Sequence, residues 1–146
     1  MDHAYSYLAV VSQRGVIDGD SVCFDVDLGF SIILKNQNTR LFGIDAAETR
    51  RVEGGSEDLK KLGLYAKAFV QEALPLGTRV TLVTYKDRRG KFGRLLAEVY
   101  LDANELSLNQ QLVEEKLAVS YFGQDRKEIL AEHYACVEHH LKLGNI

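Results

Sequence analysis

Two short polar runs place acidic and basic side chains at the ends of strand-like segments. The first run contains Asp18 and Asp20, and the second contains Arg40, Asp45 and Glu48. Carboxylate oxygens are the ligands that hard divalent cations prefer, and a guanidinium group binds phosphate oxygens through paired hydrogen bonds. The combination therefore indicates chemistry on a phosphodiester with the help of a divalent cation.

Each of these residues also has an ordinary structural explanation. Asp18-Gly19-Asp20 is a common turn sequence, because Asp readily hydrogen-bonds to its own backbone. Arg40 and Asp45 would make a structural ion pair, although residues five apart lie on opposite faces of a regular strand. Their side chains meet only if a bulge or bend separates them, so the residue types alone leave both explanations open.

Alternation of apolar and polar residues predicts five strands around the polar runs. The expected strand segments are residues 5–13, 22–28, 31–35 continuing through 39–44, 80–83 and 94–101. We expect a turn or bulge at Asn36-Gln37-Asn38 and a turn over residues 87–90. Five short strands with a helix after the third predict an α+β fold, an OB-fold-like Greek-key β-barrel with three helices.

Three amphipathic segments predict the helices. The first covers residues 59–73, with Ser56 as its N-cap. The second begins after Asn104, and the third begins after Asp125 and stops near Gly144.

Composition limits the function classes. The net charge is −3 and the sequence pI is about 5.8, which argues against a broad nucleic-acid-binding surface. No apolar run is long enough to span a membrane, and no basic-then-apolar leader begins the chain. We therefore expect a cytoplasmic protein, or a secreted one if a leader was removed. Cys23 and Cys136 are expected to be free thiols.

The chain has 146 residues and contains no repeat or Ser/Pro-rich linker. We expect a single domain over residues 1–146. Within it, the barrel would cover about residues 5–101 and the C-terminal helices about residues 104–143.

Three motifs occur together and in order along the chain. They are Ile17-Asp18-Gly19-Asp20-Ser21-Val22, Arg40-Leu41-Phe42-Gly43-Ile44-Asp45-Ala46-Ala47-Glu48-Thr49 and Lys91-Phe92-Gly93-Arg94. Together they resemble the staphylococcal nuclease (thermonuclease-like) family over roughly residues 5–142. The resemblance implies a metal-dependent endonuclease of low sequence specificity that cleaves DNA, with RNA as a further substrate, and leaves 3′-phosphate ends. It also implies Ca²⁺ as the cofactor, with Mg²⁺ or Mn²⁺ as substitutes.

The resemblance assigns the acidic side of the site. Asp20, Asp45 and the main-chain carbonyl of Ala46 would bind the metal, and Asp18 would orient these ligands. Glu48 would act as general base or align the attacking water. Ala46-Ala47 stands where the family often has Thr-Pro, so a threonine hydroxyl contact is lost while the carbonyl ligand remains.

The resemblance also assigns the basic and aromatic side. Arg40 and Arg94 would neutralise phosphate oxygens and stabilise charge in the transition state. Lys91 would contact the nucleic acid, next to Phe92 where the family commonly has tyrosine. Tyr121 would stack on a base, and a structural role for it is an equal alternative.

Other readings of the sequence stay open. A catalytically inactive OB-fold module that binds nucleic acid, or a protein-interaction module, would have the same strand pattern. Arg50 and Arg51 lie in a charged loop from which they would reach substrate. His133, His139 and His140 contain no pair spaced four apart, so we expect packing or surface roles for them.

Overall fold

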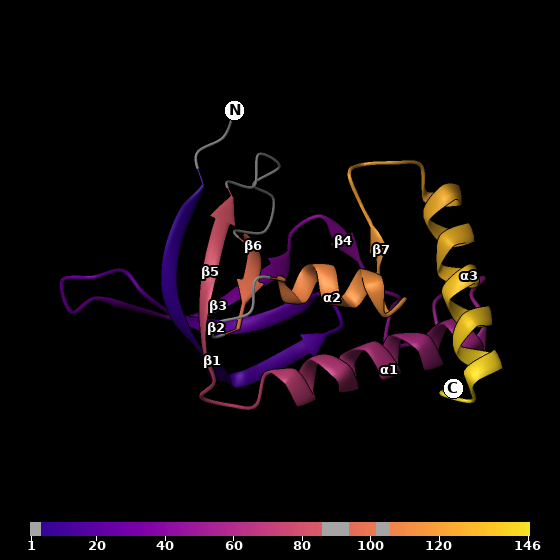
Figure 1. Ribbon diagram of the computed structural model, residues 1–146, viewed down its shortest axis with the longest axis horizontal. Coiled ribbons are helices and arrows are strands. Elements are labelled where there is room, and N and C mark those ends of the chain that lie inside the picture. The colour runs from indigo at the N-terminus through magenta and orange to yellow at the C-terminus, as the bar shows by residue number, and fades with distance from the viewer. Residues whose placement is uncertain (1–3, 86–93, 102–105) are drawn as a thin grey trace.

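The computed structural model describes residues 4–85, 94–101 and 106–146 (Figure 1). The elements in chain order are β1 (Tyr5–Asp18), β2 (Ser21–Asp27), β3 (Ile33–Leu41), β4 (Ile44–Asp45), α1 (Glu57–Ala73), β5 (Arg79–Tyr85), β6 (Leu95–Tyr100), α2 (Leu108–Glu114), β7 (Val119–Ser120) and α3 (Arg126–Leu143). The predicted α+β class is confirmed.

Five strands form a closed barrel in the order β1-β2-β3-β6-β5. Neighbouring strands are antiparallel except β3 and β6, which pair in parallel where residues 39–41 meet residues 95–97. Fully buried side chains fill the barrel, among them Val22, Phe24, Leu41, Leu82 and Val99. Each such side chain contributes about 1.5–3 kcal/mol when buried, so the barrel is a firm support for the loops at its rim.

Two details of the strands differ from the simplest expectation. β1 extends to Asp18, beyond the expected end at residue 13, and Gly15 with φ +62 accommodates an irregular register with β2. β3 runs unbroken through the expected turn or bulge at residues 36–38. The bulge is the form observed, because Asn36 has φ +53 and its N–H donates to Asp25 Oδ1 over 2.8 Å. The expected turn at residues 87–90 lies outside the described residues.

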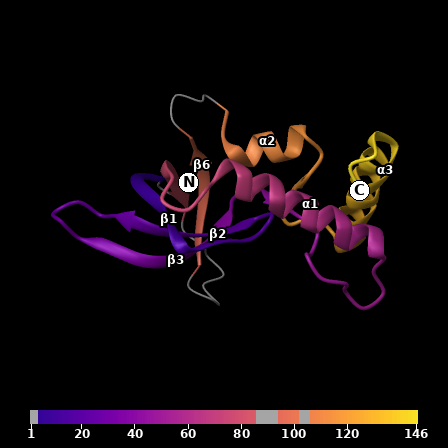
Figure 2. The same ribbon diagram turned by 90° about the horizontal axis from the view of Figure 1, so that it is seen from below.

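The first helix forms as predicted. Ser56 Oγ accepts a hydrogen bond from the Leu59 N–H over 3.2 Å and so caps α1. Its buried face carries Leu62, Ala66 and Val70, and it packs against β1 and α3. Figure 2, the view from below, shows α1 running from the barrel toward α3.

The second helix is shorter than predicted, and the third matches the prediction. α2 begins after Ser107 and ends at Glu114, because Lys116 takes φ +57 and turns the chain. The expected start at Asn104 lies outside the described residues. α3 is capped by Asp125 and ends at Gly144, which has φ +74. No helix in the described ranges is long and apolar enough to cross a membrane.

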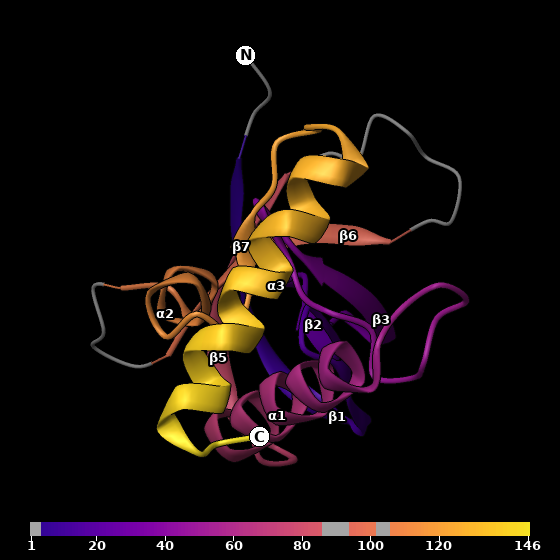
Figure 3. The same ribbon diagram turned by 90° about the vertical axis from the view of Figure 1, so that its right-hand side faces the viewer.

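A two-stranded sheet of β4 and β7 connects the barrel to the C-terminal helices. Ile44 pairs with Ser120, and Asp45 pairs with Val119. α3 packs against β7 and α1, and Figure 3 shows α3 crossing in front of these elements. This small sheet therefore places Asp45 next to α3. Both cysteines are free and buried, as predicted.

Candidate functional site

The turn between β1 and β2 positions Asp20. Its Oδ2 accepts a hydrogen bond from the Ala46 N–H over 3.0 Å, and its Oδ1 accepts one from Ser21 Oγ over 3.3 Å. Its main-chain carbonyl accepts from the Leu41 N–H over 2.8 Å. Asp20 is only 6% exposed, so its carboxylate is held between the barrel and the segment that follows β4.

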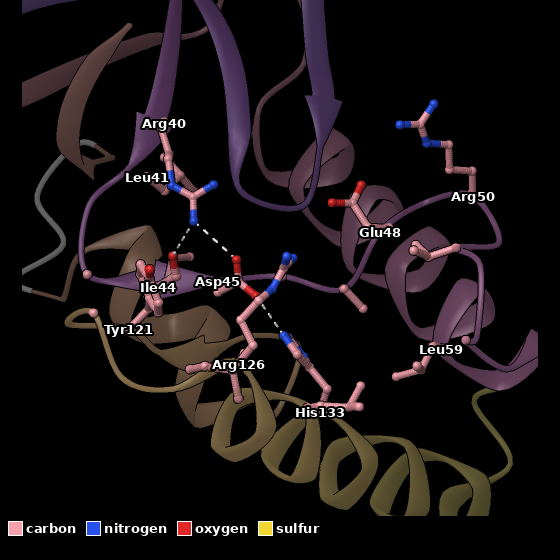
Figure 4. A pocket seen from close by; sticks show the side chains of 18 of the residues that line it. Arg40, Leu41, Ile44, Asp45, Glu48, Arg50, Leu59, Tyr121, Arg126 and His133 are labelled. Carbon is pink, nitrogen blue, oxygen red and sulfur yellow. Dashed lines mark hydrogen bonds and ion pairs between the residues drawn. The ribbon is translucent and has the colours of Figure 1, made fainter. Parts of the chain in front are cut away.

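A bend between β3 and β4 brings Arg40 to Asp45. The chain turns at Phe42 and Gly43, where Gly43 takes φ +78, a conformation that favours glycine. Arg40 Nη2 then lies 3.1 Å from Asp45 Oδ1, and it donates to the Ile44 carbonyl over 3.4 Å (Figure 4). The bend that the five-residue spacing requires is therefore present.

Arg40 also approaches the second carboxylate. Its Nη1 lies 3.5 Å from Asp20 Oδ2. One guanidinium group thus bridges Asp20 and Asp45, which come from different strands. Burial by itself would lower the pKa of Arg40, but the two carboxylates raise it above its ordinary value. The arginine therefore stays charged.

Asp45 has a second partner that the sequence did not indicate. His133 Nε2, from α3, lies 2.8 Å from Asp45 Oδ2, and Figure 4 shows Arg40 and His133 reaching Asp45 from different sides. Burial would raise the pKa of Asp45, but the hydrogen bond and charge of His133 and those of Arg40 hold it below its ordinary value. The carboxylate is therefore ionised near neutral pH.

Packing, the role expected for His133, is only one of the two roles that the structure shows. The residue is 5% exposed and shares the buried face of α3 with Ile129 and Val137, so it does pack. A buried imidazole needs a polar partner. The placement of a histidine on the apolar face of a helix is therefore a sequence signal for a hydrogen-bond partner elsewhere in the fold. The partner is 88 residues away along the chain, and no local pattern identifies it.

Small residues let three segments approach closely behind the site. A Cβ on Gly19 would lie 3.0 Å from the Cβ atoms of both Ala46 and Ala66. A Cβ on Gly63, in α1, would lie 2.2 Å from the Glu48 carbonyl oxygen. The backbone from β4 to Glu48 therefore packs directly against α1. The lack of a side chain at Gly19 and Gly63 allows this close approach.

Asp18 stands beside this arrangement as a half-buried carboxyl group. Its Oδ1 is buried and meets no hydrogen-bond partner among the described residues. Burial, with the negative charges of Asp20 and Glu48, raises the pKa of Asp18 to about 6. Burial is the largest cause of this shift, and the smaller contributions of Asp20 and Glu48 reflect the gathering of three carboxyl groups in one place.

A pocket of about 1310 Å³ opens in front of Asp45. Its lining includes Arg40, Asp45, Ala46, Glu48, Arg94 and Tyr121 among the predicted site residues, and Asp20 is not part of this lining. Tyr121 is half-buried and its N–H donates to the Gly43 carbonyl over 2.8 Å. Lys91 lies outside the described residues. The arginines of the lining are Arg40, Arg50, Arg51, Arg94 and Arg126.

The site therefore has two parts. We call Asp20, Arg40, Asp45 and His133 the inner group, because hydrogen bonds and ion pairs connect them in one cluster of buried and partly buried side chains. We call Glu48, Arg50, Arg51 and Arg126 the outer group, because their side chains line the pocket and are exposed. Sequence reasoning identified all of these residues except His133 and Arg126 as site candidates.

The geometry agrees with a comparison of the sequence with protein families. A model described as staphylococcal nuclease homologue matches residues 38–142, well over half of the chain. This chain belongs to the staphylococcal nuclease homologue family. The predicted resemblance is confirmed, and the barrel with its helices is the OB-fold-like α+β architecture of the staphylococcal nuclease domain. A comparison with individual curated proteins gave no match.

The family match begins after the β1–β2 turn. Asp18 and Asp20 therefore lie outside the matched residues of this nuclease homologue. What ties Asp20 to the site is its own hydrogen bond to Ala46 and its approach to Arg40. The first motif thus joins the second through contacts in the fold.

The donor chemistry of this nuclease homologue fits a hard divalent cation. Within the described residues, no group of three or more His, Cys, Asp and Glu side chains is placed to hold a metal. The expected set needs only two, Asp20 and Asp45, with the Ala46 carbonyl and water as further oxygen ligands. Arg40 shows that a positive group fits between the two carboxylates, and the unpartnered Asp18 Oδ1 adds negative charge beside them.

Proposed function

We propose that this chain is a divalent-cation-dependent phosphodiesterase that cleaves DNA, and RNA as a further substrate, with low sequence specificity. The observation that carries the proposal is the inner group. Its arginine bridges two carboxylates at the base of a pocket that contains a third carboxylate, Glu48, and four more arginines. Membership of the nuclease family supports the same reaction.

The charge distribution supports an anionic substrate. The whole chain carries a net charge of −3, yet five arginines line the pocket against the acidic residues Asp45, Glu48 and Glu53. The lining therefore carries two more positive than negative charges. This local excess favours a polyanion at the pocket, although the net charge of the whole chain is negative.

Each side chain has a role that follows from its chemistry. Arg40 and Arg94 would bind the oxygens of the scissile phosphate and stabilise the charge that grows there. Glu48 is exposed at the pocket wall, where its carboxylate would accept a proton from the attacking water or align that water. Asp20, Asp45 and the Ala46 carbonyl would hold Ca²⁺, which supplies further stabilisation of phosphate charge.

Plasmid digestion tests the proposal. The wild-type protein should nick and degrade a plasmid with Ca²⁺, Mg²⁺ or Mn²⁺ and should be inactive in excess EDTA. Glu48→Gln should lower the rate on the order of 10²-fold or more. Arg94→Gln should lower it by about 10²–10³-fold, because a charge-stabilising donor is lost.

Arg79→Gln is the matched control for Arg94→Gln. Arg79 is an exposed arginine at the start of β5 and does not line the pocket. Its replacement removes the same positive charge as Arg94→Gln and should leave the rate within about twofold of wild type. Equal rates for Glu48→Gln, Arg94→Gln and wild type would refute the assignment.

A catalytically inactive nucleic-acid-binding module is the second candidate. One observation favours it: Arg40 already bridges both carboxylates and His133 contacts Asp45, so the inner group has polar partners without a cation. Such a module would bind an oligonucleotide equally well in EDTA and in Ca²⁺ and would cleave it in neither. The plasmid assay and a binding titration under both conditions separate the two functions.

A further inference from the structure

We propose that His133 is a positioning residue for Asp45, and that its Nε2–H fixes the carboxylate in the orientation in which Asp45 binds a cation. This inference rests on the proposed function of the site. It assigns a role to a residue of the last helix that none of the three sequence motifs contains.

The first step is the identity of the donor. An ionised carboxylate only accepts hydrogen bonds, so in the 2.8 Å contact with Asp45 Oδ2 the His133 nitrogen is the donor. His133 Nε2 therefore donates its N–H to Asp45. The other ring nitrogen, Nδ1, is buried and has no hydrogen-bond partner in the described part of the chain.

The second step concerns the two oxygens of Asp45. Oδ2 is held by His133 and Oδ1 faces Arg40 at 3.1 Å. A carboxylate fixed at only one oxygen can rotate about its Cβ–Cγ bond, whereas contacts at both oxygens hold its plane. Arg40, which contacts Oδ1 of Asp45, also contacts Oδ2 of Asp20. By holding Oδ2 of Asp45, His133 therefore keeps Oδ1 directed toward Arg40 and Asp20.

The third step is why His133 is placed firmly enough to do this. It lies on the buried face of α3, and β7, against which α3 packs, pairs with Asp45 itself through Val119. The backbone of Asp45 and the side chain that holds its carboxylate thus belong to one packed unit. Hydrogen-bond partners that orient a metal ligand typically change metal affinity 10- to 100-fold when they are removed.

Two substitutions of similar size separate positioning from packing. His133→Gln places its amide nitrogen near the position of Nε2 and keeps a donor to Asp45. His133→Asn places its amide nitrogen near the position of Nδ1 and does not reach Asp45. Both remove the ring, so a loss of packing affects both.

His140 provides the matched control. It is a second buried histidine on α3, and its Nε2 lies 3.0 Å from the Glu115 carbonyl and 3.1 Å from the Lys116 carbonyl, away from Asp45. His140→Asn should lower thermal stability without changing cation affinity.

The experiment is a calorimetric titration of each folded protein with Ca²⁺ alone, without nucleic acid. We expect wild type, His133→Gln and His140→Asn to bind Ca²⁺ within about threefold of one another, and His133→Asn to bind about tenfold or more weakly. Thermal melts in EDTA should show similar losses for both His133 variants. Equal or tighter Ca²⁺ binding by His133→Asn would overturn the inference, as would equal weakening by Gln and Asn.

The same titration distinguishes this inference from the function on which it rests. If wild type binds Ca²⁺ in the expected order of variants but leaves plasmid intact, the positioning role stands and the nuclease activity fails. If wild type cleaves plasmid and His133→Asn binds Ca²⁺ normally, the activity stands and the positioning role fails. No Ca²⁺ binding by folded wild type would overturn both.

Discussion

The inner and outer groups of the site differ in how the fold holds them. The carboxylate of Asp20 has three partners at 3.5 Å or less, which are Ser21, Ala46 and Arg40. The carboxylate of Asp45 has two, which are Arg40 and His133. The outer group consists of exposed side chains on the segment after β4 and on the first turn of α3. One part of the site is therefore held by contacts within the protein, and the side chains of the other part extend into solvent.

This difference indicates a division of labour. A cation site gains from fixed ligands, because no ordering of the protein opposes binding. A surface that must accept many nucleic-acid sequences gains from long side chains that adapt to the position of each phosphate. The inner group is suited to the first task and the outer group to the second.

The largest effect that would test this division is expected at Arg40. Arg40→Ala leaves the partly buried carboxylates of Asp20 and Asp45 facing each other without a counter-charge. We expect a loss of about 2 kcal/mol in the free energy of unfolding in EDTA, below the 3–5 kcal/mol of a fully buried pair. Urea denaturation should show the loss, and Ca²⁺ should restore part of it. Arg50→Ala, in the outer group, should change stability by less than about 0.5 kcal/mol.

A second prediction concerns the contact between α1 and the backbone of Glu48 in the outer group. Gly63→Ala introduces a Cβ 2.2 Å from the Glu48 carbonyl oxygen, and backbone on both sides resists the shift. Overpacking costs about 1–3 kcal/mol, against a gain of about 1 kcal/mol in helix propensity. We expect a lower thermal midpoint and slower cleavage, because Glu48 moves with its backbone. Leu64→Ala, on the exposed side of α1, should have neither effect.

A smaller and pH-dependent effect is expected at Asp18. Its pKa rises from 3.8 to about 6 on folding, so the native state binds the proton more tightly than the unfolded state. The carboxylate therefore lowers stability as the pH rises from about 4 to 6, and the cost stays constant above that range. The full shift corresponds to about 3 kcal/mol, which solvent screening of this half-exposed group reduces to about 1 kcal/mol.

Asp18→Asn removes this cost. In EDTA the variant should be more stable than wild type by about 1 kcal/mol at about pH 7.5. The two proteins should be equally stable near about pH 3.5, below the range in which Asp18 titrates. Thermal melts at a series of pH values measure the difference. A stability gain that is the same at both pH values would show that charge is not its cause.

The smallest effect is expected in the outer group. Arg126→Ala should weaken binding of a single-stranded oligonucleotide a fewfold and reduce the slope of log affinity against log salt by about 1, since one phosphate contact is lost. Lys127→Ala is the control, because Lys127 carries the same charge on the next residue and does not line the pocket. If both variants weaken binding equally, the loss of affinity comes from the change in net charge and not from a lost contact in the pocket.

The sequence predicted the parts of the site whose signals are local. The alternation of residues 22–28 and the caps Ser56 and Asp125 placed β2, α1 and α3 correctly, because these patterns depend on neighbours in the chain. The bend between Arg40 and Asp45 was predictable as well, since strand geometry requires it.

The parts that escaped prediction depend on distant contacts. β4 and β7 are two residues long and carry no periodic signal. Leu117 continues an apolar pattern, yet α2 ends before it because Lys116 adopts φ +57. A packing role was expected for His133 because its partner, Asp45, comes close only through the pairing of β4 with β7 and the packing of α3 on β7.

The pairing of Asp45 with His133 also sets an order of events during synthesis. Residue 133 follows residue 45 by 88 residues along the chain, and a domain generally folds as a unit. The barrel strands β1 to β3 are synthesised long before α3. In a nascent chain, Asp45 therefore lacks its contact with His133, and the inner group is complete only after almost all of the chain described here has been made.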